Sequence, residues 1–417
     1  MTTLLTWANG SFYDLYANNR TTGKPNLITA DFIASSYALY KLSREQEVEK
    51  NVLQPRVINF VNYLYQGVVE MNLPNKKDAL AYTAMLSLLA KDGKSINIPD
   101  GYETLQVAIG KEVKLVMSAN QVAISPIVNK KIDYRVFKIP SKYQQNPAYF
   151  RTMKYAQTMP LNKKLKSAIN STIKASERLR NLEHYIKQIQ EQFIGVEQKS
   201  NTLLSTYRGL DYYIFRESKK PSLQAIEKAI NPKTSKNPMV QQRILNLYSS
   251  YDYDFKIMQT LIKNNYSNAF KGYYIQSQYR NMLYRTVFKT KSIHKESRTK
   301  ANIEPRLEET LSVMIEGALV FSNSIKNNEI DKNMILTLKE LRKVAQKKTM
   351  NMALNEKEIN LLNSLDLVFL ELTGLKDKPI SVKVTNQLSL EILSPRRVTF
   401  GNKQMGNFSF GGRFVFR

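Results

Sequence analysis

The sequence predicts a mainly helical protein, an irregular multi-helix domain followed by a small antiparallel β-sheet at the C-terminus. Apolar residues recur at steps of three and four over much of the chain, which is the period of an amphipathic helix. Gly and Pro number only 15 and 14 among 417 residues, whereas all-β folds need many turns and usually contain more of both. After Lys376 the apolar residues instead alternate with polar ones, as expected for half-buried strands.

Three helix patterns lie in the first part of the chain. Pro55 stands near the start of the first, whose apolar stripe runs over 57–68, and Pro is well tolerated in the first turn of a helix. Asn75 caps the second pattern, which ends at Asp92-Gly93, and the third runs over 100–116. We predict a helix for each of these segments.

The longest predicted helix spans 163–193. Apolar side chains form one of its faces, and a stripe of this kind packs against a core. Its other face carries the basic residues Lys166, Lys174, Arg178, Arg180 and Lys187. We interpret this second face as a solvated surface, and the alternative is a strip that binds a polyanion. Further helices are predicted at 222–230, 238–248, 270–288, 305–326, 332–350 and 355–372.

The domain boundary is placed where the pattern changes. Residues 1–375 are predicted to form the helical domain, with a subdivision near 160 and 235. Residues 376–417 contain two alternating stretches and a Phe-rich end. We expect this segment to form the small β-sheet and to pack against the helices. No repeat of fixed period is present, so a solenoid is not expected.

The chain is strongly basic. It contains 62 Lys and Arg against 35 Asp and Glu, a formal net charge of +27, and the excess is spread along the chain. A field of this sign attracts polyanions such as nucleic acid, anionic lipid head groups, acidic glycans or an acidic protein. The plainer interpretation is a surface that keeps the protein in solution. Charge alone does not choose among these partners.

Most catalytic chemistries require residue types that are missing here. There is no Cys, which removes thiolate metal sites and cysteine nucleophiles. His184 and His294 are the only histidines, and neither has a partner at the spacing of a metal site or a GxSxG-type triad. Gly93-Lys94-Ser95 and Gly411-Gly412 lack the spacings of phosphate and dinucleotide loops. We therefore expect no cofactor, no metal and no enzymatic activity.

One enzymatic alternative is left open by two acidic residues. Asp252 and Asp254 lie in a Tyr-Asp-Tyr-Asp segment that we predict to be a loop. A carboxylate-dependent hydrolase needs two carboxyl groups roughly 5 to 9 Å apart. A helix cap or an ion-pair partner is the more ordinary role for such residues, and we favour it.

Aromatic and basic residues alternate between about 266 and 300. Tyr rings stack on bases or sugars while Lys and Arg meet phosphate or carboxylate, so this composition suits an anionic polymer or a protein partner. Several of the aromatic residues also fall at helical spacing, and we favour a core face with a solvated opposite face over a binding site. The candidate binding residues are Tyr273, Tyr274, Tyr279, Arg280, Arg285, Lys289, Lys291, Lys295, Arg298 and Lys300.

A series of short motifs in the middle of the chain is distinctive. It consists of Ser125-Pro126, Ile132-Asp133-Tyr134, Phe137-Lys138 and Tyr149-Phe150-Arg151-Thr152-Met153. The series resembles the domain-of-unknown-function family 3160, and the resemblance extends over nearly the whole chain to Gly411-Gly412. It implies a helical, usually exported or lipid-anchored protein to which no activity is assigned.

The chain departs from the pattern of this family in two places. Gln278-Tyr279-Arg280 stands where members tend to carry Arg-His-Asp. Asn265 stands where members carry Asp. We expect the polar site that these groups form elsewhere to be altered or lost here, which weighs further against an enzymatic function.

Together these features predict a non-catalytic binding or scaffold protein of the cell envelope, within a larger assembly. Nucleic-acid or other polyanion binding is the alternative. No apolar run approaches the ~20 residues that span a membrane, so no integral membrane insertion is expected, and residues 1–10 lack a signal-peptide pattern. The expected address is extracytoplasmic, in the periplasm or envelope, if a leader has been removed, and otherwise cytoplasmic.

Overall fold

The structure is a computed structural model in which the chain divides into two compact units. The first comprises Met1–Gln46, Gln192–Gly195 and Gly209–Arg417, and the second comprises Glu47–Glu191 and Val196–Arg208. These units do not coincide with the predicted division at 375 or its subdivision. The structure describes residues 30–140, 143–209, 223–231, 238–247, 249–266, 269–270, 272–274, 277, 307–325, 328–350 and 352–373, and the backbone of strands at 388–395, 398–400, 403–407 and 410–416.

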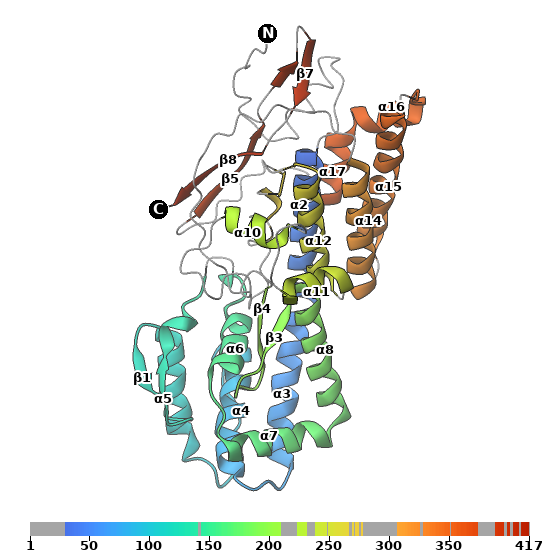
Figure 1. The fold of residues 1–417 in the computed structure, drawn as a ribbon. Coiled ribbons are helices and arrows are strands. Elements are labelled where there is room, and N and C mark those ends of the chain that lie inside the picture. Colours follow the sequence, from blue (N-terminus) through green and yellow to red (C-terminus); the bar gives the residue numbers. More distant parts are fainter. Residues whose placement is uncertain are drawn as a thin grey trace. The chain divides into compact units, whose positions relative to one another are not determined.

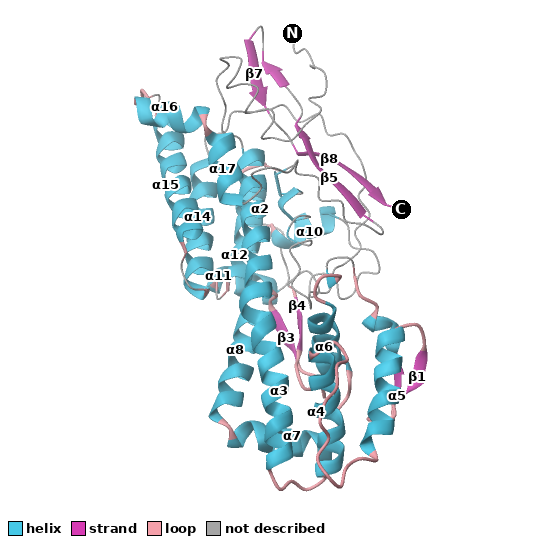
Figure 2. Cartoon of the chain, turned by 180° about the vertical axis from the view of Figure 1, so that it is seen from behind, coloured by secondary structure: helices cyan, strands magenta, loops and turns pink. Residues whose placement is uncertain are grey.

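The second unit consists mainly of helices (Figure 1). Helices α3 and α4 pack together, and α7 crosses their lower part in both views (Figure 2). Its helices are α3 (Gln54–Glu70), α4 (Lys76–Ala90), α5 (Leu105–Ser118), α6 (Pro147–Thr158), α7 (Lys163–Ala175) and α8 (Glu177–Phe193), with a π-helical turn at Glu49–Leu53 and a 3-10 turn at Tyr134–Phe137.

Helix α4 is the centre of this unit. Every side chain from Ala79 to Leu89 is buried, because α4 packs against α3, α5 and α6. Helix α3 has the opposite character: it buries one apolar stripe and leaves its other face to solvent, as the period of 3.6 residues requires. The predictions of helices at 54–68, 75–93 and 100–116 are confirmed, although α5 begins only at Leu105.

The prediction of one continuous helix over 163–193 is wrong, because the chain breaks at Ser176. Ser176 takes extended backbone angles (φ −113°, ψ 117°), and its Oγ accepts a hydrogen bond from the backbone N–H of Leu179 at 3.3 Å. Asn162 caps the preceding helix α7 in the same way, through Leu165 N–H at 2.8 Å. Ser and Asn at these positions satisfy amides that a helix start leaves unpaired, so the sequence encodes two helices that share one apolar stripe.

Two short antiparallel hairpins lie in the middle of the chain, where no strand was predicted. Strand β1 (Val122–Ile124) pairs with β2 (Lys131–Asp133), with Ala123 opposite Ile132. Strand β3 (Val196–Gln198) pairs with β4 (Thr206–Arg208), with Glu197 opposite Tyr207. At three residues per strand, these segments are too short for a period of two to stand out in the sequence.

The first unit is also built of helices. Helix α14 packs against both α12 and α15, and α2 buries Phe32, Ile33, Tyr37 and Tyr40 in the same core. The described helices are α2 (Ala30–Val48), α10 (Leu223–Ile230), α11 (Pro238–Asn246), α12 (Ser250–Lys263), α14 (Leu307–Ser324), α15 (Glu329–Thr349), α16 (Glu356–Asn363) and α17 (Leu365–Thr373). The predictions at 222–230, 238–248, 305–326 and 332–350 are confirmed, whereas the helix predicted at 355–372 is interrupted at Ser364.

The β-structure differs from the single C-terminal sheet that was expected. The backbone of β5 (Leu388–Pro395) pairs with β8 (Phe410–Phe416), and that of β6 (Val398–Phe400) pairs with β7 (Lys403–Asn407), as two separate antiparallel ladders. The strands whose side chains the structure describes are those of the two mid-chain hairpins. A single sheet packed on the helices is therefore not supported, while the mainly helical class is confirmed.

Among the described residues, no helix combines the length and the apolar composition that crossing a bilayer demands.

Candidate binding site

The structure places two of the predicted binding residues in the core. Tyr273 and Tyr274 are both 0% exposed, and the Tyr273 hydroxyl donates a hydrogen bond to Asp254 Oδ1 at 2.6 Å. Their helical spacing reflects burial, as the favoured core interpretation expected, so Tyr273 and Tyr274 are withdrawn as candidates for binding a partner. The other eight candidates lie outside the described residues: Tyr279, Arg280, Arg285, Lys289, Lys291, Lys295, Arg298 and Lys300.

Asp252 and Asp254 lie in the first turns of α12 and not in a loop. Asp252 forms a capping box with Ser249 and an ion pair with Arg243 Nε at 2.9 Å. Asp254 is paired with Lys41 Nζ at 2.7 Å. Both carboxylates are buried, and burial raises the pKa of Asp252 although Arg243 and the cap act in the opposite direction. These contacts give both residues the structural roles of a cap and an ion pair.

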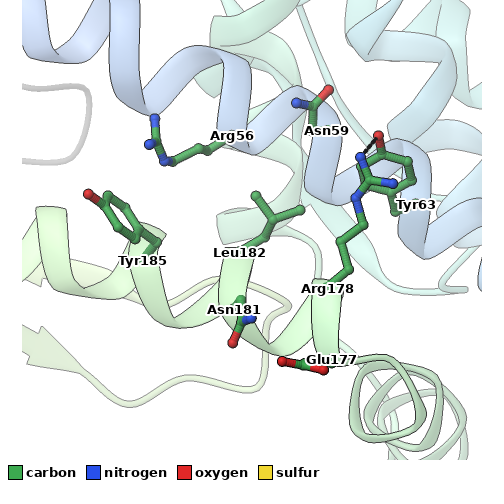
Figure 3. Close-up of a pocket in the computed structure, with 8 residues that line it drawn as sticks. All are labelled: Arg56, Asn59, Tyr63, Glu177, Arg178, Asn181, Leu182 and Tyr185. Carbon is green, nitrogen blue, oxygen red and sulfur yellow. Dashed lines mark hydrogen bonds between the residues drawn. The ribbon is translucent and has the colours of Figure 1, made fainter.

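A concave surface rich in Arg and Tyr lies within the second unit, between α3 and α8. It is a groove of about 610 Å³, and Figure 3 shows that its side chains come from these two helices alone. Because the groove opens to solvent, its polar side chains are accessible. The lining residues are Arg56, Asn59, Tyr63, Glu177, Arg178, Asn181, Leu182 and Tyr185.

Two Arg–Tyr pairs join the helices across the groove. The Cζ atom of Arg56 lies 4.4 Å from the ring centre of Tyr185, and that of Arg178 lies 3.5 Å from the ring centre of Tyr63. Arg178 Nη2 also donates to the Tyr63 hydroxyl, and Arg56 Nη1 donates to the carbonyl of Val52 at 2.9 Å. Each stacked pair contributes about 0.5–1 kcal/mol at an exposed site, and stacking holds each guanidinium in a defined orientation.

The two helices supply the same pattern of residues. Arg56, Asn59 and Tyr63 on α3 have the spacing Arg-x-x-Asn-x-x-x-Tyr, and Arg178, Asn181 and Tyr185 on α8 repeat it. Arg of each helix stacks on Tyr of the other, so the helices run antiparallel and the groove has an approximate twofold symmetry. The sequence prediction assigned Arg178 to a solvated face and gave Arg56 no role. This repeated pattern is the signal that identifies the site.

A family model described as "Protein of unknown function (DUF3160)" matches residues 5–230. The chain belongs to the DUF3160 family. The DUF3160 match confirms the resemblance over about half of the chain, whereas the sequence motifs had suggested that it covers nearly all of it. No curated protein and no solved structure is significantly similar to the chain.

The groove lies entirely within the DUF3160 segment, since all its residues fall between 56 and 185. By contrast, Asp252 and Asp254 lie beyond the end of the match at residue 230. The family segment therefore contains the Arg–Tyr groove and the two helices, α3 and α8, that form it.

The ionisable side chains of the groove are Glu177, the two Arg and the two Tyr. Glu177 is its one carboxylate, and none of its eight lining residues is His, Cys, Ser or Lys. In the part of the chain that the structure describes, no group of three or more His, Cys, Asp or Glu side chains is arranged to hold a metal ion. What the groove offers is two oriented guanidinium groups, which match carboxylate and phosphate oxygens, together with two amides and two phenol rings.

Proposed function

We propose that the protein is a non-catalytic binding or scaffold protein that holds an acidic partner protein in the α3/α8 groove. The observation that carries this proposal is the pair of guanidinium groups, Arg56 and Arg178, each stacked on a Tyr ring of the opposite helix. A guanidinium that is already oriented loses less side-chain entropy on binding a carboxylate than a freely moving one. Two such groups within one groove form a prepared site for acidic side chains.

The charge of the unit favours the same partner. Residues 47–191 and 196–208 contain 24 Lys and Arg against 13 Asp and Glu, a net charge of +11. A surface of this sign attracts an acidic protein and accelerates the encounter. It also repels a second copy of this chain, whose net charge is +27. An acidic partner is therefore favoured over self-association at this groove.

For the compartment we propose the cell envelope, within a larger assembly. The support is the resemblance to a family whose members are usually exported or lipid-anchored. Fractionation of the native cells, followed by detection of the protein with an antibody, tests the address. Recovery in the cytosolic fraction alone would overturn this part of the proposal and would leave the binding activity to be judged separately.

The binding activity is tested with a defined probe. A fluorescent Glu-rich peptide is titrated with the full chain, and fluorescence anisotropy reports the affinity. Charge-assisted hydrogen bonds contribute about 1.5–3 kcal/mol each, so R56Q/R178Q is expected to weaken binding at least about tenfold. R56K/R178K keeps the charge but loses the planar guanidinium, and its affinity for the peptide is expected to lie between those of the native chain and R56Q/R178Q.

The matched control is K111Q/K114Q. Lys111 and Lys114 are exposed on α5 in the same unit, and this variant removes the same number of positive charges outside the groove. We expect less than about a twofold change, because charges outside a contact act mainly through a screened field. Equal weakening by both double variants would show that the peptide binds to general charge, and the proposed site would be wrong. Single-stranded DNA is the competing ligand. The acidic-protein assignment would be overturned if the DNA bound the native chain more tightly than the peptide does and bound R56Q/R178Q with the same affinity as the native chain.

A further inference from the structure

The repeated pattern of the groove fixes the distance between its two basic ends. On α3, Arg56 and Tyr63 are seven residues apart, and Tyr63 holds Arg178 at its end of the groove. Seven residues of an α-helix rise about 10 Å along the axis. The two guanidinium groups therefore stand about two helical turns apart along the groove, with Asn59, Asn181 and Leu182 between them.

We propose that the occupant of the groove is an acidic α-helix of the partner protein, with two carboxylates seven residues apart. This inference rests on the proposed function and makes it specific. Residues i and i+7 of a helix are separated by about 10 Å and lie only about 20° apart around the axis. One carboxylate then reaches Arg56 and the other reaches Arg178, from a single face of the partner helix.

An extended strand does not fit this spacing. Side chains on one face of a strand recur every two residues, at about 6.6 Å and then at about 13 Å, and neither distance equals about 10 Å. A helical partner also matches the middle of the groove. Its residues at i+3 and i+4 lie over the exposed Asn59 and Asn181 and the half-buried Leu182. A small or apolar residue there contacts Leu182, and a polar one meets the two amides.

The charge of the groove limits how many acidic groups its ligand can bring. Arg56 and Arg178 are the two basic residues that line it, and Glu177 stands beside Arg178 as the single acidic one. Two carboxylates on the partner helix leave the site with one excess negative charge, within a unit of net charge +11. A ligand with a long uninterrupted run of acidic groups would bring further carboxylates toward Glu177, and like charges at short range repel.

The approximate twofold symmetry has its own consequence. Because α3 and α8 each present Arg, Asn and Tyr at the same spacing and run antiparallel, turning the partner helix end over end exchanges its two carboxylates between Arg56 and Arg178, and the ends of the groove differ mainly in Glu177 beside Arg178. The site is therefore expected to accept the helix in either direction with similar affinity.

Two helical peptides of identical composition test the spacing. Each contains two Glu in an Ala-rich host, seven positions apart in one peptide and five apart in the other, which places the second pair on different faces. Circular dichroism confirms equal helicity. The full chain is expected to bind the first peptide at least about tenfold more tightly, and R56Q/R178Q is expected to lose this preference.

The possible results separate this inference from the proposed function. If both peptides bind equally and both weaken with R56Q/R178Q, the groove binds acidic groups but the helical spacing is wrong. If R56Q/R178Q binds both peptides as tightly as the native chain does, and thermal unfolding shows that the variant is folded, the proposed function itself is wrong.

A charge-reversal experiment tests the symmetry. The peptide with Glu seven apart is changed so that one Glu becomes Lys, and its binding to R56E and to R178E is measured. R56E and R178E are each expected to bind the original peptide more weakly than the native chain does and to recover affinity with the Lys peptide. The affinities of the two variants for the Lys peptide are expected to agree within about threefold, because the peptide can bind in either direction. Recovery by one variant alone would overturn the symmetric arrangement, and recovery by neither would overturn the pairing of the two carboxylates with Arg56 and Arg178.

Discussion

Arg44 donates two parallel hydrogen bonds to Asp331, from Nε to Oδ1 at 2.9 Å and from Nη2 to Oδ2 at 3.0 Å. The Tyr40 hydroxyl adds a third bond to Oδ1 at 2.6 Å. All three side chains are buried, and the pair joins α2 to the first turn of α15 across 287 positions of sequence. This contact lies within the first unit and fixes which end of α15 meets α2.

Removal of one partner of this pair is expected to destabilise the protein strongly. In D331A the guanidinium of Arg44 keeps its charge in the core without the carboxylate, and such losses cost about 3–5 kcal/mol. The measurement is the free energy of unfolding in urea. R44M/D331L, which removes both charges and keeps similar volume, is expected to be more stable than D331A, because no unpaired charge is left. A double variant that is less stable than D331A would contradict this account.

The start of α12 provides a smaller and more local test. Ser249 Oγ accepts from Asp252 N–H at 3.2 Å while Asp252 Oδ2 accepts from Ser249 N–H at 3.0 Å, so both orphan amides are satisfied. S249A removes one of these bonds and is expected to lower the free energy of unfolding by about 1 kcal/mol. The control S118A replaces an exposed Ser at the end of α5. It is expected to change the free energy of unfolding by less than about 0.5 kcal/mol. Equal effects of the two variants would argue against the cap.

Glu112 gives the second unit a predicted dependence on pH. Its buried carboxyl group accepts hydrogen bonds from Ser125 Oγ at 2.7 Å and from the Tyr134 hydroxyl at 2.8 Å. Burial raises the pKa of Glu112 above its usual 4.5, more than these hydroxyl groups lower it. A raised pKa in the folded state means that the folded protein holds the proton more tightly, so the stabilising contribution of Glu112 is complete below pH 4.5 and is lost as the pH rises through the raised pKa.

The isosteric variant E112Q removes this titration. Its stability relative to the native sequence is expected to increase between pH 4.5 and pH 8, which thermal unfolding across that range measures. E103Q is the contrasting control. Backbone hydrogen bonds lower the pKa of the exposed Glu103, so its contribution to stability is lost only below pH 4.5, and the difference between E103Q and the native chain is expected to stay constant from pH 4.5 to pH 8. An unchanged difference between E112Q and the native chain across the range would show that Glu112 does not titrate there.

Several of the helices that the sequence predicted correctly have one clear apolar stripe. Helices α3 and α14 are examples, since the period of their apolar residues directly reports which face is buried. The break at Ser176 was missed because Ile173 and Leu179 keep the stripe in phase on either side of it. Hydrophobic period reports the buried face but not the continuity of the helix, which depends on one capping hydrogen bond.

The binding site depends on contacts between residues distant in sequence. Arg56 and Tyr185 are 129 positions apart, and no local pattern indicates that they stack. The burial of Lys41 and Asp254 was equally hidden, because a period-based prediction assigns every charged side chain to solvent, while an ion pair allows both to be buried. Once α3 and α8 are known to be neighbours, the repeated Arg, Asn and Tyr spacing becomes informative.

The contact between α3 and α7 is close enough to be tested by adding a single carbon atom. A Cβ placed on Gly67 would lie 2.7 Å from Thr172 Cγ2, so G67A is expected to destabilise the protein by about 1–3 kcal/mol, although Ala favours a helix by about 1 kcal/mol over Gly. T172S removes that methyl group and keeps the hydroxyl, which donates to Ala168 O at 3.1 Å. G67A/T172S is therefore expected to recover most of the loss, with a coupling of at least about 1 kcal/mol in a double-mutant cycle of urea unfolding. Strictly additive effects would mean that α3 and α7 separate to accommodate the new atom, and that Gly67 does not set their distance.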